Sequence, residues 1–499
     1  MNFVFIAFGI IIILYGVFLR LYGLDIQSWW IDEAYSINAA VSTIEKGYPL
    51  LDSGWLYNGQ LAFTYPLAAF IKLFGIHNWS TRLPSVILSF IFLGVIFQFC
   101  RRFFNTRVAI LVTLFMTFSY WEIAWARQAR NYAMFQLFFW ISIYYFWEIL
   151  FNKFSYKNLF AWITASLITL LTHGLALLLL PIYGITFIIV FWKKIIRENI
   201  QLLKNKVAMV MLVTTLIVFL IFKGNIIAVI SGNTMPEFYR INYIKFAIEH
   251  FKTTMLIGLI PLVAFYKQNL NKKTLLLIMY YMAFLIAATF FIKTPGHRYM
   301  FVILPVLYIL SALGIDFILN GKWWRKAVLI TILAPLLIIS GEFKFTPSES
   351  YFLESDPSPA ELIADGKEPY KYYIYAPQPD WEAAYNYIKA HRKPDDIIIS
   401  VQPVFNKLYF GEKGYWISYN LNGGLENRPE KDRYVDAETI IGVEDLKKIA
   451  KNNHGYIILD YLAMDGKIPE EILKYIVNNS SPVYVDMQNS WSYIALYKI

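Results

Sequence analysis

The sequence predicts a polytopic α-helical membrane protein, with about 11 transmembrane helices and additional interfacial helices, that carries a soluble α/β domain at its C-terminal end. Hydrophobic residues make up 58% of the 499 residues and charged residues only 16%. Soluble domains have about 45–50% apolar and about 25% charged residues, so this composition excludes an ordinary soluble enzyme. The charge is also divided, because residues 1–340 carry a net +17 and residues 341–499 a net −7. Basic residues between long apolar segments are typical of membrane topology and not of a nucleic-acid interface.

Eleven apolar segments are candidates for membrane-spanning helices. The first, 3–19, is just long enough to cross a bilayer core at about 1.5 Å per residue, and it lacks the basic start and cleavage site of a signal peptide. The others are 83–99, 108–125, 131–150, 158–172, 174–192, 207–222, 252–266, 274–292, 299–319 and 327–340. The shorter apolar segment 61–75 contains Pro66 and Lys72, and we expect it to lie in the membrane interface as an amphipathic helix.

The distribution of lysine and arginine supports this topology. If 61–75 does not cross, alternate short loops collect most of the basic residues, at 101–107, 153–157, 193–206, 267–273 and 322–326. The positive-inside rule places these loops in the cytoplasm. We therefore expect an integral plasma-membrane protein with a cytoplasmic amino terminus, an outer first loop at 20–82 and an extracytoplasmic region after Ser340.

The composition divides the chain into a transmembrane domain at 1–341, a proline-marked linker at 342–380 and a soluble domain at 381–499. The soluble domain alternates helical patterns with strand-like segments, which predicts an α/β fold. The helical patterns are 381–392, 443–452 and 468–477, and the strand-like segments are 396–401, 455–461, 482–487 and 491–498. The domain contains no nucleotide-binding motif, so we expect it to support the structure or to dock an acceptor.

Two adjacent acidic residues, Asp32 and Glu33, follow the first span at the outer surface. One interpretation is a solvated helix start with Asp32 as its cap. A carboxylate at the boundary between lipid and water can instead act as a general base. The position alone favours neither interpretation.

Basic and aromatic side chains gather on the same outer side of the predicted topology. Arg127 and Arg130 share one helix face and suit an anionic ligand such as a phosphate, unless they only extend to the surface. His297 and Arg298 open the tenth span after a Pro-Gly turn and suit either a phosphate or an interfacial anchor. His173 lies between two apolar segments, where a lone histidine is more often structural.

Together these clusters indicate transfer of a group from a phosphate. A carboxylate pair opposite several cations and a histidine can activate a hydroxyl and stabilise a phosphate leaving group. The sequence contains no Walker motif, and the outer side of a membrane normally lacks nucleotides. We therefore expect the activated substrate to be linked to a lipid.

Four short motifs occur in an order that resembles a known family. They are Trp30-Ile31-Asp32-Glu33-Ala34, Arg82-Leu83-Pro84-Ser85, Gln128-Ala129-Arg130-Asn131-Tyr132-Ala133, and Arg298-Tyr299 followed by Pro305. The chain resembles the GT-C membrane glycosyltransferases of the protein O-mannosyltransferase and aminoarabinose transferase group. The resemblance covers about residues 1–340 and, more weakly, the tail from Trp381.

The resemblance implies a GT-C fold and an inverting glycosyltransferase. Its donor would be a polyprenyl-phosphate sugar, and its acceptor a hydroxyl of a glycan, a lipid or a protein. Asp32 would be the general base, with Glu33 assisting it. The donor phosphate would bind Arg130, Arg298, Arg127 and His297. Contacts to the substrates would come from His173, Tyr132, Tyr299 and Gln128.

Gln128 departs from the family pattern, because many relatives have an acid at that position. A divalent metal would lose a charged ligand there, so we expect no metal site and keep a divalent metal as the less favoured alternative. We expect membrane lipid, and no nucleic acid, as a further partner.

Two alternative functions stay open. An oligosaccharyltransferase of the same superfamily would carry a Trp-Trp-Asp motif, which the chain lacks. A polytopic transporter or flippase for a lipid-linked or anionic substrate would show ionisable residues near mid-membrane and a repeated half. The sequence instead shows charges at the ends of the spans and no internal repeat.

Overall fold

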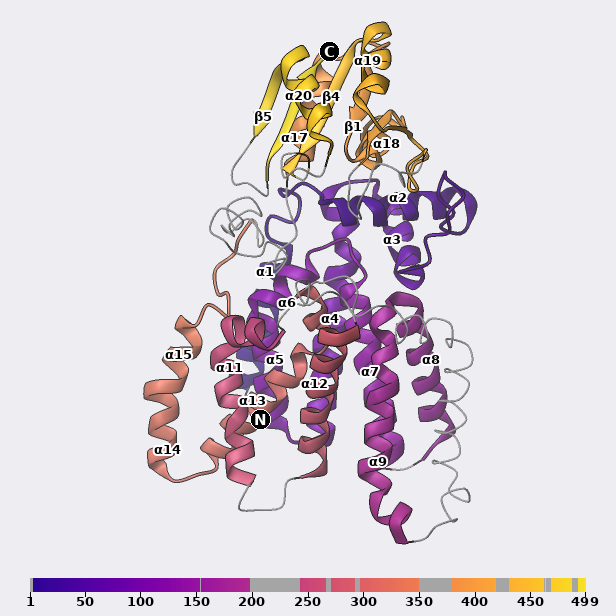
Figure 1. Cartoon of the computed structure of the whole chain (residues 1–499). Coiled ribbons are helices and arrows are strands. Elements are labelled where there is room, and N and C mark those ends of the chain that lie inside the picture. The colour runs from indigo at the N-terminus through magenta and orange to yellow at the C-terminus, as the bar shows by residue number, and fades with distance from the viewer. Residues whose placement is uncertain are drawn as a thin grey trace. The chain divides into compact units, whose positions relative to one another are not determined.

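The computed structural model (Figure 1) describes residues 3–152, 154–197, 243–265, 271–291, 297–349, 379–418, 430–461, 463, 468–486 and 492–499. The chain divides into two compact units. The helical unit comprises Met1–Tyr22, Ser85–Arg127 and Asn131–Pro347, and the mixed unit comprises Gly23–Pro84, Gln128–Arg130 and Ser348–Ile499. The three-part division at 341 and 381 stays a prediction, and residues 350–378 of the expected linker lie outside the described residues.

Helices occupy every predicted span that the structure describes, and 207–222 lies outside the described residues. They are α1 (Phe3–Leu21), α4 (Asn78–Phe103), α5 (Thr106–Phe118), α6 (Tyr120–Ala126), α7 (Tyr132–Phe151), α8 (Tyr156–Thr172), η1 (Gly174–Leu178), α9 (Leu179–Arg197), α11 (Tyr243–Phe265), α12 (Lys272–Phe291), η4 (His297–Val302), α13 (Leu304–Leu319), α14 (Trp323–Val328), η5 (Leu329–Leu333) and α15 (Ala334–Ile339). The prediction of a polytopic helical membrane fold is confirmed.

Four predicted spans are not single α-helices. Two of them change helix type: 174–192 opens with the 3-10 helix η1, and 327–340 contains the π-helical turn η5. The span 108–125 is broken at Ser119, whose hydroxyl accepts a hydrogen bond from the amide of Glu122 at 3.2 Å and so caps α6. Serine favours such caps because its side chain replaces a missing backbone partner. The span 299–319 opens with the short 3-10 helix η4 and continues as α13, which has Pro305 in its first turn.

The helical unit shows the burial pattern of a membrane protein. Four of its described segments are long and apolar enough to cross a membrane, namely Asn78–Phe103, Tyr132–Phe151, Gly174–Phe191 and Lys272–Thr289. Large apolar side chains point outward from several helices, among them Ile11, Leu14, Phe160, Leu171, Ile188, Leu256, Ile286, Ile330 and Ile338. In water such a surface would be unfavourable, whereas in a bilayer it faces lipid tails.

Helix ends beside four of the five predicted cytoplasmic loops meet at one end of the helical unit. The end of α4 meets the end of α7 through Arg102 and Glu148, whose Nε and Oε1 are 2.6 Å apart. The start of α5 meets the end of α13 through Arg107 and Asp316 at 3.4 Å. Lys273, at the start of α12, donates to the carbonyl of Phe103 at 3.0 Å. These contacts bring alternate helix ends together, as the positive-inside argument requires. The assignment of this end to the cytoplasm stays a prediction.

The mixed unit begins with two helices from the first loop, α2 (Ile31–Lys46) and α3 (Leu61–Phe74), which pack against each other. Gly47 ends α2 in the left-handed conformation, with a φ of 81°, which glycine adopts without a steric penalty. The predicted helix at 61–75 is present as α3, with Pro66 inside it. Its place in the membrane interface stays a prediction.

The C-terminal part of the mixed unit is a mixed six-stranded sheet in the order β3-β2-β1-β4-β6-β5. Its strands are β1 (Ile397–Ser400), β2 (Tyr415–Ile417), β3 (Glu438–Ile440), β4 (Gly455–Asp460), β5 (Ser481–Asp486) and β6 (Ile494–Lys498), and its helices are α17 (Trp381–His391), α18 (Pro403–Phe410), α19 (Val443–Asn452) and α20 (Glu470–Asn479). The first four strands in this order run parallel, and β6 is antiparallel to β4 and β5. The sequence missed α18, β2 and β3. The two strands have three residues each, which is too short to show periodicity.

Candidate functional site

The site begins at the first turn of α2, where Asp32 and Glu33 point in different directions. Successive residues of a helix are about 100° apart around its axis, so neighbouring side chains cannot share one environment. The side chain of Asp32 is 24% exposed, whereas that of Glu33 is fully buried. The two carboxylates that the sequence presents as a pair are therefore separate features of the structure.

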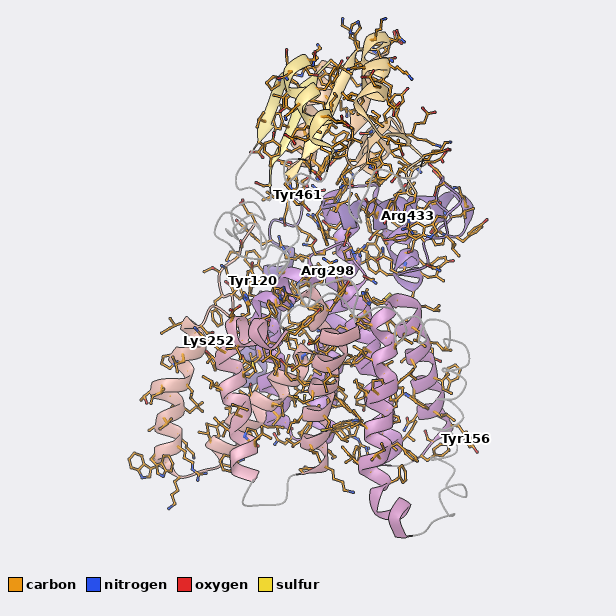
Figure 2. The ribbon with its side chains drawn as sticks, viewed as in Figure 1. Tyr120, Tyr156, Lys252, Arg298, Arg433 and Tyr461 are labelled. Atoms are coloured by element: carbon orange, nitrogen blue, oxygen red, sulfur yellow. The ribbon has the colours of Figure 1, made fainter. Side chains whose placement is uncertain are left out.

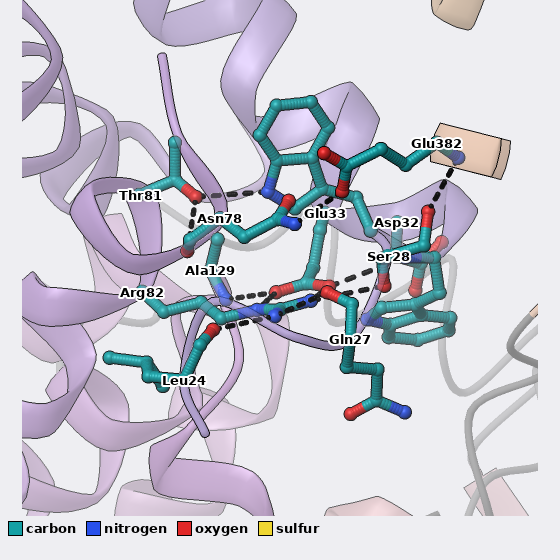
Figure 3. Close-up of polar contacts among 12 residues, drawn as sticks. Leu24, Gln27, Ser28, Asp32, Glu33, Asn78, Thr81, Arg82, Ala129 and Glu382 are labelled. Atoms are coloured by element: carbon teal, nitrogen blue, oxygen red, sulfur yellow. Dashed lines mark hydrogen bonds and ion pairs between the residues drawn. The ribbon is translucent and has the colours of Figure 1, made fainter. Parts of the chain in front are cut away.

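Glu33 belongs to a buried ion pair with Arg82 (Figure 3). Arg82 Nε donates to Glu33 Oε1 and Arg82 Nη2 to Glu33 Oε2, both at 2.9 Å. The remaining N–H groups of the guanidinium donate to backbone carbonyls of the preceding loop, those of Leu24, Gln27 and Ser28, at 2.7 to 3.1 Å. The same carboxylate accepts from the amide of Trp30 at 3.3 Å and from that of Ala129 at 2.7 Å. Glu33 thus joins three separate chain segments.

Asp32 pairs with Arg130, which arrives from the turn between α6 and α7. Arg130 Nη2 lies 3.5 Å from Asp32 Oδ2, and Arg130 Nη1 donates to the backbone carbonyl of Asp32 at 2.9 Å. The same nitrogen donates to Ser36 Oγ at 2.9 Å and to the hydroxyl of Tyr57 at 3.4 Å. Gln60 holds the two hydroxyls that Arg130 contacts, because its side-chain amide donates to both Ser36 and Tyr57. Asp32 is therefore a partly exposed carboxylate that an arginine orients. It is not the cap of α2, whose N-cap is Trp30.

Three tyrosines surround this carboxylate. Burial raises the pKa of Tyr35, Tyr57 and Tyr434, and the negative charge of Asp32 raises all three further. Their hydroxyls are therefore protonated at neutral pH. Tyr35 donates a hydrogen bond to Gln402 at 3.1 Å, so the C-terminal segment contributes directly to the surroundings of Asp32.

Arg127 binds backbone carbonyls, and its predicted phosphate contact stays a prediction. Its Nη1 donates to the carbonyls of Leu19 at 3.3 Å and Arg20 at 3.2 Å and also to that of Tyr22, so it satisfies the C-terminal end of α1. The side chain is buried. A helix leaves its last carbonyls without partners inside the helix, and a guanidinium in this position supplies them.

We expect Arg127→Met to destabilise the protein by about 2 kcal/mol, because charged hydrogen bonds contribute about 1.5–3 kcal/mol each and water can replace part of them. Donor affinity should stay within twofold. Thermal unfolding and donor titration measure the two effects, with the exposed Arg101→Met as the matched control. A tenfold loss of donor affinity without a change in unfolding temperature would restore the phosphate role.

Three of the predicted substrate contacts come together in the helical unit. His173 ends α8, and its ring lies 5.9 Å from that of Tyr132, at the start of α7, and 5.6 Å from that of Tyr299 on η4. His173 Nδ1 accepts from the amide of Leu175 at 3.0 Å, which fixes the ring orientation. His297 is buried and stacks on Phe246 at 4.2 Å.

Arg298, labelled in Figure 2, is half-buried and lies 5.6 Å from the centre of the Tyr299 ring. Arg298 therefore lies next to Tyr299, one of the two tyrosines whose rings contact His173. Gln128, in the mixed unit, is buried beside Ala129 and Arg130. Within the described residues, no group of three or more His, Cys, Asp or Glu side chains could hold a metal ion.

The sequence missed several residues that build this site. Arg82 was visible only as part of a motif, and Ser36, Tyr57 and Gln60 carry no signal of their own. Tyr35 follows Glu33 by two residues on α2 and belongs to no motif. Tyr434 lies in a segment between strands that no pattern connects with α2. Each of these residues is identified only by its contacts in the fold.

Comparisons with known proteins agree with this fold. Residues 61–221, about a third of the chain, match the family model described as dolichyl-phosphate-mannose-protein mannosyltransferase. No curated protein matches the sequence. Among solved structures, ArnT from Cupriavidus metallidurans bound to undecaprenyl phosphate is similar, with a TM-score of 0.61 and 13% identity over 99% of this chain and 98% of that chain.

A second similar structure is the Archaeoglobus fulgidus oligosaccharyltransferase in the apo form, with a TM-score of 0.58 and 11% identity over 94% of this chain and 72% of that chain. A third is AglB from the same organism in complex with an inhibitory peptide and a dolichol-phosphate, with a TM-score of 0.57 and 11% identity over 98% and 74%. The chain is an integral membrane protein with the GT-C fold.

Proposed function

We propose that the protein transfers a sugar from a polyprenyl-phosphate donor to a hydroxyl of an acceptor at the outer face of the membrane. The observation that carries the proposal is the pair of Asp32 and Arg130, a partly exposed carboxylate held 3.5 Å from a guanidinium at the start of α2. The GT-C fold and the matched family segment support the reaction class. ArnT in its complex with undecaprenyl phosphate and AglB in its complex with dolichol-phosphate support the donor class.

In the proposed reaction Asp32 is the general base. Its carboxylate takes the proton of the acceptor hydroxyl while the oxygen forms a bond to the anomeric carbon. The bond between that carbon and the phosphate oxygen breaks at the same time, and polyprenyl phosphate leaves with the electron pair. A single displacement of this kind inverts the anomeric carbon.

The contacts of Arg130 suggest a different role from the one the family resemblance implies. Its N–H groups already reach Asp32, Ser36 and Tyr57, so we assign Arg130 to the orientation of the base. We assign the donor phosphate to Arg298, because a guanidinium can bind phosphate oxygens through two parallel hydrogen bonds.

The direct test uses the purified full-length protein in lipid nanodiscs, a radiolabelled polyprenyl-phosphate sugar and a cell-envelope extract as acceptor. We expect label to move into the acceptor and free polyprenyl phosphate to accumulate in equal amount. Movement of the intact labelled lipid across a vesicle membrane without cleavage would favour the flippase alternative.

Arg298→Ala should weaken donor binding by at least tenfold, because two charge-assisted hydrogen bonds to the phosphate are lost. Arg298→Lys should lose less donor affinity, since lysine keeps the positive charge but cannot donate two parallel hydrogen bonds. Donor titration measures both, and Lys252→Ala, an exposed lysine on α11, is the control. Equal losses for alanine and lysine would indicate that Arg298 acts through packing.

A further inference from the structure

The surroundings of Asp32 include five side chains that the proposed reaction does not use as acid, base or phosphate ligand. We call Tyr35, Trp55, Tyr57, Arg433 and Tyr434 the aromatic cluster. Three come from the first loop and α2, and two come from the segment that precedes β3. The cluster therefore combines both parts of the mixed unit.

The side chains of the aromatic cluster contact one another and differ in exposure. Tyr57 is buried, Tyr35, Trp55 and Tyr434 are partly buried, and Arg433 is exposed. The guanidinium of Arg433, labelled in Figure 2, lies 3.7 Å from the centre of the Trp55 ring. The rings of Tyr35 and Tyr434 stack at 3.6 Å with an angle of 10°. Trp55 meets Tyr57 edge-on at 5.5 Å and Tyr434 at 5.4 Å. Such contacts hold aromatic rings in fixed orientations.

Backbone contacts fix the segment that carries Arg433 and Tyr434. Asn38, on α2, donates to the carbonyl of Tyr434 at 3.3 Å, and the hydroxyl of Ser53 donates to the carbonyl of Arg433. The carboxylate of Asp432 accepts from the amides of Tyr434 at 2.8 Å and Val435 at 2.7 Å. The segment is thus ordered before any ligand arrives, which lowers the entropic cost of binding.

The cluster is continuous with the proposed base. Tyr57 accepts from Arg130, which pairs with Asp32, and its ring in turn meets that of Trp55. The buried Tyr57 therefore connects the aromatic cluster with the pair of Arg130 and Asp32.

Arg433 differs from the other arginines of the site. Arg82 and Arg130 donate to protein oxygens, whereas the guanidinium of Arg433 makes no hydrogen bond or ion pair with any residue that the structure describes. Its side chain is exposed. A stacked guanidinium with available donors suits a phosphate or a carboxylate.

We propose that the aromatic cluster is the acceptor subsite and that it binds an anionic saccharide or glycolipid. The phosphate or carboxylate of this acceptor binds Arg433, its sugar ring contacts the partly exposed rings of Trp55 and Tyr434, and one of its hydroxyl groups faces Asp32. This inference rests on the proposed function for the final transfer, but the binding itself needs no donor.

The test measures binding to the full-length protein in nanodiscs without donor, so that no transfer can occur. The probes are an alkyl glucoside, the same glucoside with a 6-phosphate, and the matching alkyl glucuronide. We expect at least one anionic probe to bind tenfold or more tightly than the neutral glucoside. The probe that does so distinguishes phosphate from carboxylate as the recognised group.

Arg433→Ala should remove this preference for the anionic probe and leave binding of the neutral glucoside within twofold. Trp55→Leu should weaken the binding of all three probes. The control is Arg392→Ala, which also removes an arginine lying over an aromatic ring, at 4.8 Å from Phe410, outside the cluster. Inorganic phosphate should compete at least tenfold more weakly than the preferred probe, because it has no ring to contact the cluster.

Equal binding of neutral and anionic probes, an unchanged preference in Arg433→Ala, or competition by inorganic phosphate at the level of the glucoside probe would each overturn the inference. These outcomes are independent of the transfer assay. A protein that binds the anionic probe through Arg433 but transfers no sugar would contradict the proposed function and leave the subsite intact.

Discussion

Asp32→Asn should lower the rate of sugar transfer by about 10²- to 10⁴-fold and leave donor affinity nearly unchanged. The amide has the shape of the carboxylate and can still accept a hydrogen bond from Arg130, whose Nη2 lies 3.5 Å from Asp32 Oδ2. It cannot take a proton from an acceptor hydroxyl. The loss should therefore appear in kcat, measured with a radiolabelled polyprenyl-phosphate sugar, while unfolding temperature stays constant.

Glu45→Gln is the matched control for this experiment. Glu45 lies on the same helix, near its other end, and is exposed. Its amide variant should keep full activity. If Asp32→Asn transferred sugar within a few-fold of wild type while Gln128→Ala abolished transfer, the assignment of the base would be wrong.

The helices of the membrane part could be predicted because a bilayer imposes one strong requirement on them. Each span must be apolar over most of its length, and this pattern is visible in the sequence alone. The break at Ser119 could not be predicted in the same way. A capping serine inside an apolar segment is indistinguishable from one that faces a neighbouring helix.

The candidate site was predicted only in part. The motifs contain Asp32, Arg130 and Tyr299, and these residues and His173 each lie near the end of an apolar segment. Their functional roles stay predictions, whereas the contact between His173 and Tyr299 is seen in the structure. The contacts of Arg130 with Tyr57, and of Tyr35 with Tyr434, join segments that are far apart in the chain. A single sequence holds no information on which distant loop covers which helix face, so the contribution of the C-terminal segment was missed.

The adjacent residues Asp32 and Glu33 show that the sequence also fails to predict the surroundings of neighbouring side chains. The sequence cannot say which of two neighbouring acids is buried, because that depends on the loop and the turn that pack against the helix. Arg82 and the amide of Ala129 both reach Glu33. We therefore propose that Asp32 serves the reaction and Glu33 the fold, although the family resemblance gives Glu33 an assisting role in catalysis.

Glu33→Gln should destabilise the mixed unit by about 3–5 kcal/mol, since the neutral amide leaves the buried guanidinium of Arg82 without its counter-charge. We expect a marked fall in unfolding temperature and faster proteolysis of the loop at 23–30. The three carbonyls that Arg82 also contacts cannot compensate, because they carry only partial charges.

The double variant Glu33→Leu with Arg82→Met should be more stable than Glu33→Gln alone, because removal of both charges avoids the cost of one unpaired buried ion. A double-mutant cycle built on these changes measures the coupling between the two side chains. The transfer assay then separates the two roles of the acidic pair. If Glu33→Gln kept its unfolding temperature and lost transfer by the same factor as Asp32→Asn, Glu33 would act in catalysis, and the buried pair with Arg82 would have to open during the reaction.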